Sequence, residues 1–485
     1  MKSLTTSART LATRAASLSA WALIGMLGPS MASAGAQPVD QAMIDQGRYL
    51  ATASDCIACH TSNKAKPMAG GHAIASPVGN IYAPNITPSK THGIGQYTEA
   101  QFSDAVRKGV RADGARLYPA MPYTAYAHIT DEDMRALYVY FMHGVQPVDE
   151  PSPETNLPFP MNQRAAMIGW NALFARTAPL TPAPDQSMLW NRGRYLALGP
   201  AHCATCHTPR GFFMQENNHL ALQGAQIGPW YAPDITSSKS HGIGTWSVDD
   251  LTTYLATGRL QGKAQAGGPM AEAVTHSFSQ MTEQDLRAIS TYILSVPGTE
   301  SATHADTPNR FEHGQAGDKL TAFRGTSYQA GMQLMDVKLG AQLYSANCAS
   351  CHGASGQGTR DGYYPSLFGK SITGEAQATN LLAAILNGVD RETPQGGHVF
   401  MPPFGDQDNA MVPLDNREIA ALANYILTTY GNPKVSVSPD DVQTIREGGP
   451  KSDLVLLARL GMGAALLLLA LGLVGWRRRS RRRGS

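Results

Sequence analysis

Apolar residues recur at helical spacing in three well-separated stretches of the chain. These stretches are 133–141, 285–294 and 418–427. Such spacing predicts amphipathic helices that each turn one face toward a hydrophobic core. A second predicted helix lies upstream of each stretch, around 47–51, 193–197 and 338–344. The pattern therefore predicts a mainly α fold, in which an N-terminal and a C-terminal helix bracket each of three regions.

The first two regions are copies of one plan. The pentapeptide GRYLA occurs at 47–51 and again at 193–197, and HGIG occurs at 92–95 and again at 241–244. Between them, YAPNIT at 82–87 returns as YAPDIT at 231–236. A period near 150 residues indicates a duplicated domain. The third region is shorter and diverged, and three domains suit a chain of 485 residues.

The two ends of the chain differ from the rest. Residues 1–34 have the layout of a secretory signal peptide, with three basic residues, an apolar run and the small-residue cleavage site Ala32-Ser33-Ala34. Residues 454–476 form one predicted transmembrane helix, and the arginine-rich residues 477–485 should stay in the cytoplasm. An uncleaved N-terminal anchor and a tail that binds nucleic acid are weaker alternatives. We expect a single-pass protein of the bacterial inner membrane with its body in the periplasm.

The net charge of +2 hides an acidic body. Ten of the 39 basic residues lie in the signal, the span and the tail, which leaves 29 basic against 37 acidic residues. The exported part thus has a net charge of −8. Such a surface does not favour nucleic acid, because phosphates require a positive face.

All six cysteines of the chain lie in three CxxCH motifs, one in each region. The motifs are Cys56-Ile57-Ala58-Cys59-His60, Cys203-Ala204-Thr205-Cys206-His207 and Cys348-Ala349-Ser350-Cys351-His352. A structural zinc site takes four ligands, usually from two such pairs brought together. Three pairs, each followed by His, do not divide into sets of four in this way. A redox-active CxxC has no use for a His after every copy. Covalent haem uses every residue, because the thiols join the two vinyl groups and the His binds iron. We predict three covalently bound haem c groups.

The sixth iron ligand is expected to be a methionine in a loop before the last helix of each region. Met121 lies in Pro119-Ala120-Met121-Pro122, whose prolines favour an extended loop, and Met401 precedes two prolines. Met270 lies in Gly268-Pro269-Met270, at the same offset from Met121 as the second HGIG from the first. Core packing is the competing role for any methionine.

Several histidines are rival ligands, although a lone His in a loop is more often a surface residue. They are His72, His128, His276 and His398. The paired His92 and His241 lie in glycine-rich segments, which predict either a structural turn or a contact with a haem propionate.

These features divide the chain into nine segments. They are a signal peptide at 1–34, haem domains at 35–146, 186–298 and 335–432, connections at 147–185 and 299–334, a tether at 433–453, the span at 454–476 and the tail at 477–485. The first connection includes a predicted amphipathic helix from Met161 to Arg176. Met167, Trp170 and Phe174 share one face of this helix, and Arg164 and Asn171 lie opposite. That face could pack on a neighbouring domain or contact a partner or the membrane surface. The second connection is expected to be flexible.

The signal, the three CxxCH regions, YPAMPY at 118–123, the HGIG segments and GPMAE at 268–272 resemble the tri-haem cytochrome c subunit of membrane-bound periplasmic dehydrogenases. The resemblance covers nearly the whole mature chain. It implies a subunit that accepts electrons from a separate catalytic subunit and passes them to ubiquinone. That partner is a PQQ alcohol dehydrogenase in one branch and a flavin (FAD) sugar or sugar-acid dehydrogenase in another. The C-terminal anchor and DGYYPSL at 361–367 are more similar to the flavin branch.

Two classes of function remain open. The first is an electron-transfer subunit that is not an enzyme on its own. The second is a multihaem enzyme such as a peroxidase, which requires an iron with an open position. Three candidate Met ligands favour the first class, and the sequence contains no phosphate loop, nucleophile elbow or dinucleotide fingerprint.

Overall fold

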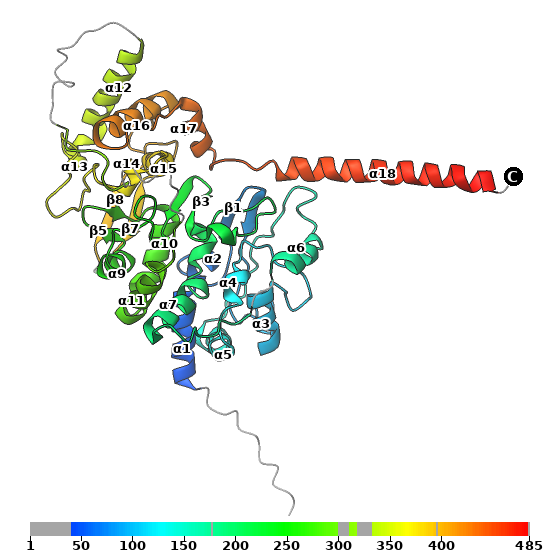
Figure 1. Ribbon diagram of the computed structural model, residues 1–485. Helices are drawn as coiled ribbons and strands as arrows, with labels where there is room; N and C mark the ends of the chain where they lie inside the picture. The colour runs from blue at the N-terminus through cyan, green and yellow to red at the C-terminus, as the bar shows by residue number, and fades with distance from the viewer. Residues whose placement is uncertain (1–39, 176–177, 299–309, 318–331, 394–395, 484–485) are drawn as a thin grey trace, which may run out of the picture. The chain divides into compact units, whose positions relative to one another are not determined.

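The computed structural model describes residues 40–175, 178–298, 310–317, 332–393 and 396–483 (Figure 1). The signal peptide predicted at 1–34 lies outside the described residues. The fold is mainly helical, as expected, and its strands form small two-stranded hairpins. The first region comprises the elements from α1 to η1, the second those from α7 to α11, and the third those from α12 to α16.

The first and second regions contain matching elements. The first comprises α1 (Gln41–Ala53), α2 (Cys56–His60), β1 (Ala73–Ser76), β2 (Gly79–Tyr82), α3 (Glu99–Lys108), α4 (Tyr123–Tyr126), α5 (Asp131–Val139) and η1 (Tyr140–Gly144). The second comprises α7 (Met188–Leu198), α8 (Cys203–His207), η2 (Asn218–Leu220), β3 (Gln223–Ile227), β4 (Trp230–Asp234), α9 (Val248–Thr257), β5 (Arg259–Leu260), β6 (Ala264–Gln265), α10 (Gly268–His276), η3 (Phe278–Gln280) and α11 (Glu283–Ile293). In both, a hairpin and a helix follow the CxxCH motif before the closing helix.

The third region lacks a hairpin directly after its CxxCH motif. It comprises α12 (Met332–Asn347), α13 (Ala349–His352), α14 (Ser371–Gly374), α15 (Thr379–Asn387), β7 (Val389–Glu392), β8 (His398–Met401) and α16 (Asn416–Tyr430). Its core is formed mainly by α15 and α16, whose buried residues include Leu382, Ile385, Leu422 and Leu427.

In each region the opening and closing helices cross at a glycine, which confirms the bracketing by two helices. A Cβ on Gly47 would lie 2.0 Å from the carbonyl oxygen of Ala136 in the closing helix, so only glycine fits there. The corresponding distance is 1.8 Å at Gly193 and 2.2 Å at Gly340. The close approach brings α1 against α5, α7 against α11 and α12 against α16. The glycine of GRYLA is therefore the point at which the two helices meet.

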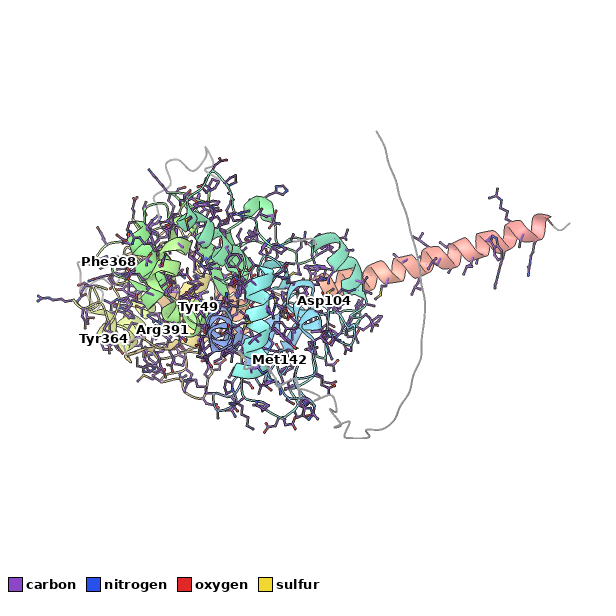
Figure 2. The ribbon with its side chains drawn as sticks, turned by 90° about the horizontal axis from the view of Figure 1, so that it is seen from below. Tyr49, Asp104, Met142, Tyr364, Phe368 and Arg391 are labelled. Carbon is purple, nitrogen blue, oxygen red and sulfur yellow. The ribbon has the colours of Figure 1, made fainter. Side chains whose placement is uncertain are left out.

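The first and second regions are joined by a reciprocal pair of hydrogen bonds. Tyr49, labelled in Figure 2, lies on α1. Its hydroxyl donates to Asp285 on α11 at 2.6 Å. The Tyr195 hydroxyl on α7 donates to Asp133 on α5 at 2.5 Å. Because each tyrosine is the third residue of GRYLA, the two contacts are equivalent under the repeat, as in an interface with two-fold symmetry. In the third region an exposed Gln342 occupies this position, two residues after Gly340.

The connection between the first two regions contains a shorter helix than predicted. α6 spans Ala166–Phe174, and Trp170 packs on Tyr123 of the first region with ring centroids 6.2 Å apart. Asn171, expected on the opposite face, accepts a hydrogen bond from the Tyr123 hydroxyl and donates to the carbonyl of Lys108. That expectation was wrong, because a polar partner on the first region draws the amide inward.

Two other segments are more ordered than their composition indicated. Residues 433–453, expected as a tether, contain α17 (Pro439–Arg446), which begins at a Ser438 capping box and buries Val442 and Ile445 in the core of the third region. Within the second connection, residues 310–317 are described, and Arg310 is buried there. Buried contacts therefore fix α17 and Arg310, while residues 299–309 and 318–331 of the second connection lie outside the described residues.

The chain ends in α18 (Leu454–Arg483). Among the described residues, one helix, Leu454–Arg481, is long and apolar enough to cross a membrane. Its most apolar 18 residues have a mean hydropathy of 2.3 and are exposed. Its apolar part covers the predicted span.

Candidate haem-binding sites

Each CxxCH motif begins a short helix and turns its histidine toward a backbone carbonyl. The Nδ1 atoms of His60, His207 and His352 lie 2.8, 2.7 and 2.8 Å from the carbonyl oxygens of Pro84, Pro233 and Pro365. A carbonyl only accepts, so Nδ1 carries the proton in each ring. The other nitrogen, Nε2, is then left with a lone pair that can bind a metal.

Burial keeps these histidines neutral. It lowers the pKa of His60, His207 and His352 below the ordinary value, although the hydrogen bond to each carbonyl opposes that shift. A neutral imidazole with a fixed tautomer is the form that binds iron. The three sites share this arrangement, including the diverged third region.

Burial favours the thiol over the thiolate at five of the six cysteines. Burial raises the pKa of Cys56, Cys59, Cys203 and Cys348 to about 12, and that of Cys206 is also raised. A redox-active dithiol requires the opposite shift, because the thiolate is the reactive form. The environment therefore favours sulfurs committed to another bond over a redox-active pair.

The second and third motifs open into one large cavity of about 720 Å³. It is lined by Cys203, Cys206 and His207 on one side and by Cys348, Cys351 and His352 on the other. Most of the remaining wall is apolar, with aromatic side chains from both regions. Its size and lining are those of a pocket for a large, mostly apolar cofactor.

The candidate methionines lie in different local structures. Met270 and Met401 both line this cavity. Met401, expected in a loop, is instead the last residue of strand β8, directly before two prolines. Met270, also expected in a loop, lies instead in the first turn of α10. Pro269 is tolerated there because the first amides of a helix have no acceptor within the helix, so the N–H that proline lacks breaks no helical hydrogen bond. Met121 is partly buried and packs against the core of the first region, as Cys56 and Ile57 of the first motif also do.

The first and second motifs are in contact through an aromatic side chain. Tyr126, buried on α4, donates to the carbonyl of Ser54, two residues before Cys56. Its ring lies 5.6 Å, centroid to centroid, from that of His202, the residue before Cys203. The three motifs are therefore neighbours in chain order, the first beside the second and the second facing the third.

The HGIG segments form tight turns. A Cβ on Gly93 would lie 2.1 Å from the carbonyl oxygen of Thr87, and one on Gly242 would lie 2.3 Å from that of Thr236. This close approach explains the glycines by structure alone. The rival His398 is exposed, and its Nε2 donates to the Asp390 carboxylate at 2.6 Å. The ring of His128 contacts the carbonyl of Ala178.

Sequence reasoning missed Arg310 and Trp246, which line the cavity beside the second motif. Neither residue lies in a recognisable sequence motif. Arg310 lies in a connection that composition alone marks as flexible, so the signal that identifies it is burial, which appears only in three dimensions.

Comparison with known proteins agrees with this geometry. A family model for cytochrome c matches residues 44–144, 192–297 and 337–430. The chain therefore belongs to the cytochrome c family, and with one CxxCH motif in each matched segment it carries three haem c groups.

Relatives place the chain more narrowly. It is 47% identical over 431 residues to the fructose dehydrogenase cytochrome subunit of Gluconobacter japonicus, covering 88% of this chain and 87% of that one. It is 38% identical over 441 residues to the cytochrome c subunit of the quinone alcohol dehydrogenase of Gluconobacter oxydans (strain 621H), with coverage of 88% and 87%. It is 35% identical over 430 residues to the gluconate 2-dehydrogenase cytochrome c subunit of Pantoea cypripedii, with coverage of 86% and 92%. The chain belongs to the family of dehydrogenase cytochrome subunits, whose role is electron transfer.

The residues present fit haem. Each motif offers an imidazole with a free Nε2 and two cysteine thiols, and two of the motifs face an apolar cavity of suitable size. Two buried donors on the cavity wall, Trp246 Nε1 and Arg310 Nε, have no hydrogen-bond partner among the described residues. Such donors match a cofactor that carries carboxylates.

Proposed function

We propose that this chain carries electrons from a periplasmic flavin-dependent sugar or sugar-acid dehydrogenase to membrane ubiquinone. Bound haem supplies one-electron chemistry at iron, whereas oxidation of a sugar or alcohol needs a two-electron acceptor in another subunit. The observation that carries the proposal is the contact of three CxxCH motifs in sequence order, the second and third sharing one cavity.

In this proposal His60, His207 and His352 bind the three irons through Nε2, and the cysteine pairs hold the haems covalently. Met121, Met270 and Met401 supply the sixth ligands. The carbonyls of Pro84, Pro233 and Pro365 orient the imidazoles, a role that supports metal binding by keeping the ligand nitrogen aimed. With six ligands at each iron, substrate has no open position, which favours a relay over a peroxidase.

The choice of a flavin partner rests on similarity. Identity is 47% to the fructose dehydrogenase subunit against 38% to the alcohol dehydrogenase subunit, over alignments of similar length. A PQQ alcohol dehydrogenase is the alternative partner. The two differ in the substrate that reduces the purified complex.

Attachment to the inner membrane is assigned to α18, with the haem regions on the periplasmic side. Arg477, Arg479 and Arg481 follow the apolar run, and such a block stays in the cytoplasm. The end of the relay would thus lie close to the lipid phase in which ubiquinone dissolves.

Purification of the complex from membranes tests the partner. We expect a flavin-containing subunit to accompany the chain, and fructose or gluconate to reduce the haems while ethanol does not. A partner with PQQ and reduction by ethanol would transfer the chain to the alcohol dehydrogenase branch. Purification without any larger dehydrogenase subunit would contradict the proposal.

A further inference from the structure

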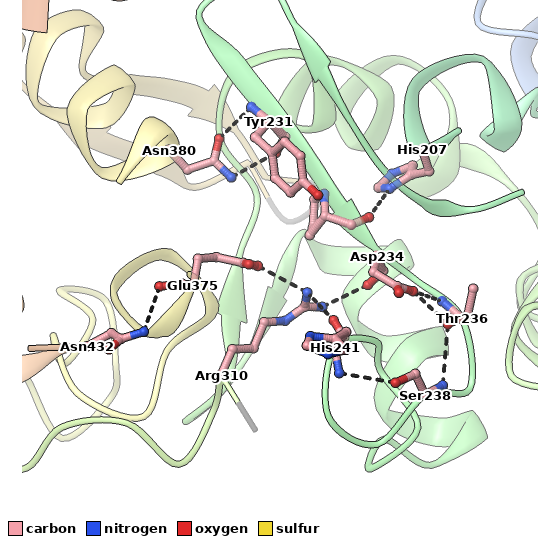
Figure 3. A network of polar contacts seen from close by, with 11 residues as sticks. His207, Tyr231, Asp234, Thr236, Ser238, His241, Arg310, Glu375, Asn380 and Asn432 are labelled. Atoms are coloured by element: carbon pink, nitrogen blue, oxygen red, sulfur yellow. Dashed lines mark hydrogen bonds and ion pairs between the residues drawn. The ribbon is translucent and has the colours of Figure 1, made fainter. Parts of the chain in front are cut away.

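Arg310 joins the second region to the third from a buried position. Its side chain donates to the carbonyl oxygens of His241 at 2.9 Å and Asp234 at 3.0 Å, both in the second region (Figure 3). It also forms an ion pair at 3.0 Å with Glu375 of the third region. Asp234 directly follows Pro233, whose carbonyl orients His207. The guanidinium therefore lies beside the second haem site.

One donor of Arg310 has no partner among the residues that the structure describes. Its Nε is buried without a hydrogen bond, while the residue is 5% exposed and lines the shared cavity. The Nε1 of Trp246, on the same wall, is likewise buried and unpartnered. Buried donors are nearly always satisfied, and because these two line the cavity, an acceptor on a molecule bound there would satisfy both.

We propose that Arg310 and Trp246 bind a carboxylate of the second haem, and that Arg310 thereby raises the reduction potential of that haem. The inference rests on haem binding at the second motif, as proposed above. Oxidised haem carries one more positive charge than reduced haem, so a nearby cation favours the reduced form. Glu375 of the third region holds the Arg310 guanidinium in place. The reduction potential of the second haem should therefore depend on the packing of the third region against the second.

The first region has a different arrangement at the equivalent position. Asn85, the counterpart of Asp234, donates to the carbonyls of Val148 and Glu150 in the connection that follows. Ser89 donates to the carboxylate of Asp149 in the same connection. The first connection thus brings an acidic side chain to this turn and the second brings a cation. The effect of Arg310 should be confined to one haem of the three.

Arg391 provides a matched control. It is 4% exposed, has an unpartnered Nε and donates from the third region to the carbonyl of Thr257 in the second. It lies outside the set of residues that line the cavity. Arg391→Gln therefore removes an equally buried cation from the same junction without removing a donor to the cavity.

The test is a spectroelectrochemical redox titration of the full chain with its three haems, comparing the unmodified chain with R310Q and R391Q. We expect R310Q to lower one of the three components by about tenfold in the equilibrium constant for reduction, about 59 mV. R391Q should leave all three in place. Trp246→Phe keeps a similar volume and removes the N–H, and it should lower the same component by less.

Equal potentials in R310Q and the unmodified chain would overturn the proposal, as would the same shift in R391Q or a shift in all three components. If R310Q does not fold, Trp246→Phe decides alone, and an unchanged set of potentials contradicts the proposal. The titration needs neither a catalytic subunit nor a quinone. A wrong partner assignment would therefore leave this result intact.

Discussion

The reciprocal tyrosine contacts should set the stability of the paired first and second regions. Removing both hydroxyls, in a Tyr49→Phe and Tyr195→Phe double variant, breaks the bonds to Asp285 and Asp133 while keeping the rings. A hydrogen bond to a charged group contributes about 1.5–3 kcal/mol. Each carboxylate keeps another donor, Arg192 for Asp285 and Gln46 for Asp133, which limits the loss.

We expect each single variant to lose about 2 kcal/mol and the double variant about 4 kcal/mol in the free energy of unfolding of this pair. With a urea m-value of about 2–3 kcal/mol/M, the double variant's midpoint should fall by about 1–2 M. Urea unfolding of the full chain in detergent, followed by far-UV circular dichroism, measures this shift.

Tyr138→Phe is the matched control, because its hydroxyl donates to the neutral carbonyl of Tyr97 within the first region. That bond should contribute only about 1 kcal/mol. If the double variant moved the midpoint no further than Tyr138→Phe, the reciprocal contacts would not hold the two regions together, and the reasoning would fail.

Three other outcomes are expected. Replacing Met121, Met270 or Met401 by Ala should open one iron and give a high-spin signal for one haem in three, and an unchanged spectrum of Met270→Ala would remove that residue from the ligand set. A chain that ends at Asp453 should keep three haems. It should leave the membrane fraction in washes that retain the full chain, because a spanning helix supplies the stable attachment. Retention of the short form in the membrane fraction would assign a second attachment to α6. Burial alone would raise the pKa of Asp285, but hydrogen bonds from Arg192 and Tyr49 hold it below its ordinary value. The stability that this carboxylate contributes is therefore full above about pH 4 and lost as the pH falls through its lowered pKa, so unfolding of Asp285→Asn should be less sensitive to acid over that range.

The features predictable from sequence are those encoded locally. The CxxCH motifs, the repeat and the bracketing helices all depend on residues within one region. The glycine of GRYLA is one such feature. The repeated pentapeptide is visible in the sequence, and in the structure its glycine touches the closing helix. Of the candidate ligands, Met121 lies between its prolines outside any helix or strand, as expected, whereas Met401 ends strand β8. Their role as iron ligands stays a prediction.

The rest depends on contacts between regions. In the sequence, nothing distinguishes Tyr49 and Tyr195 from other tyrosines on amphipathic helices. Their role appears only in the fold, where each hydroxyl meets a carboxylate of the other region. The shared cavity of the second and third motifs leaves no periodic signal in either region. Arg310 gains its burial from three carbonyl and carboxylate partners that lie far away in the chain. Composition marks its segment as a linker because composition records no tertiary contact.

The most direct test of the electron-transfer role is anaerobic mixing of the purified chain with fructose, gluconate and ethanol while haem absorbance is followed. Alone, the chain should stay oxidised with every substrate, since it has no two-electron acceptor. With its catalytic subunit, substrate should reduce the haems and a ubiquinone analogue should reoxidise them. Reduction of the haems by substrate without a second protein would contradict the account and make the chain an enzyme in its own right.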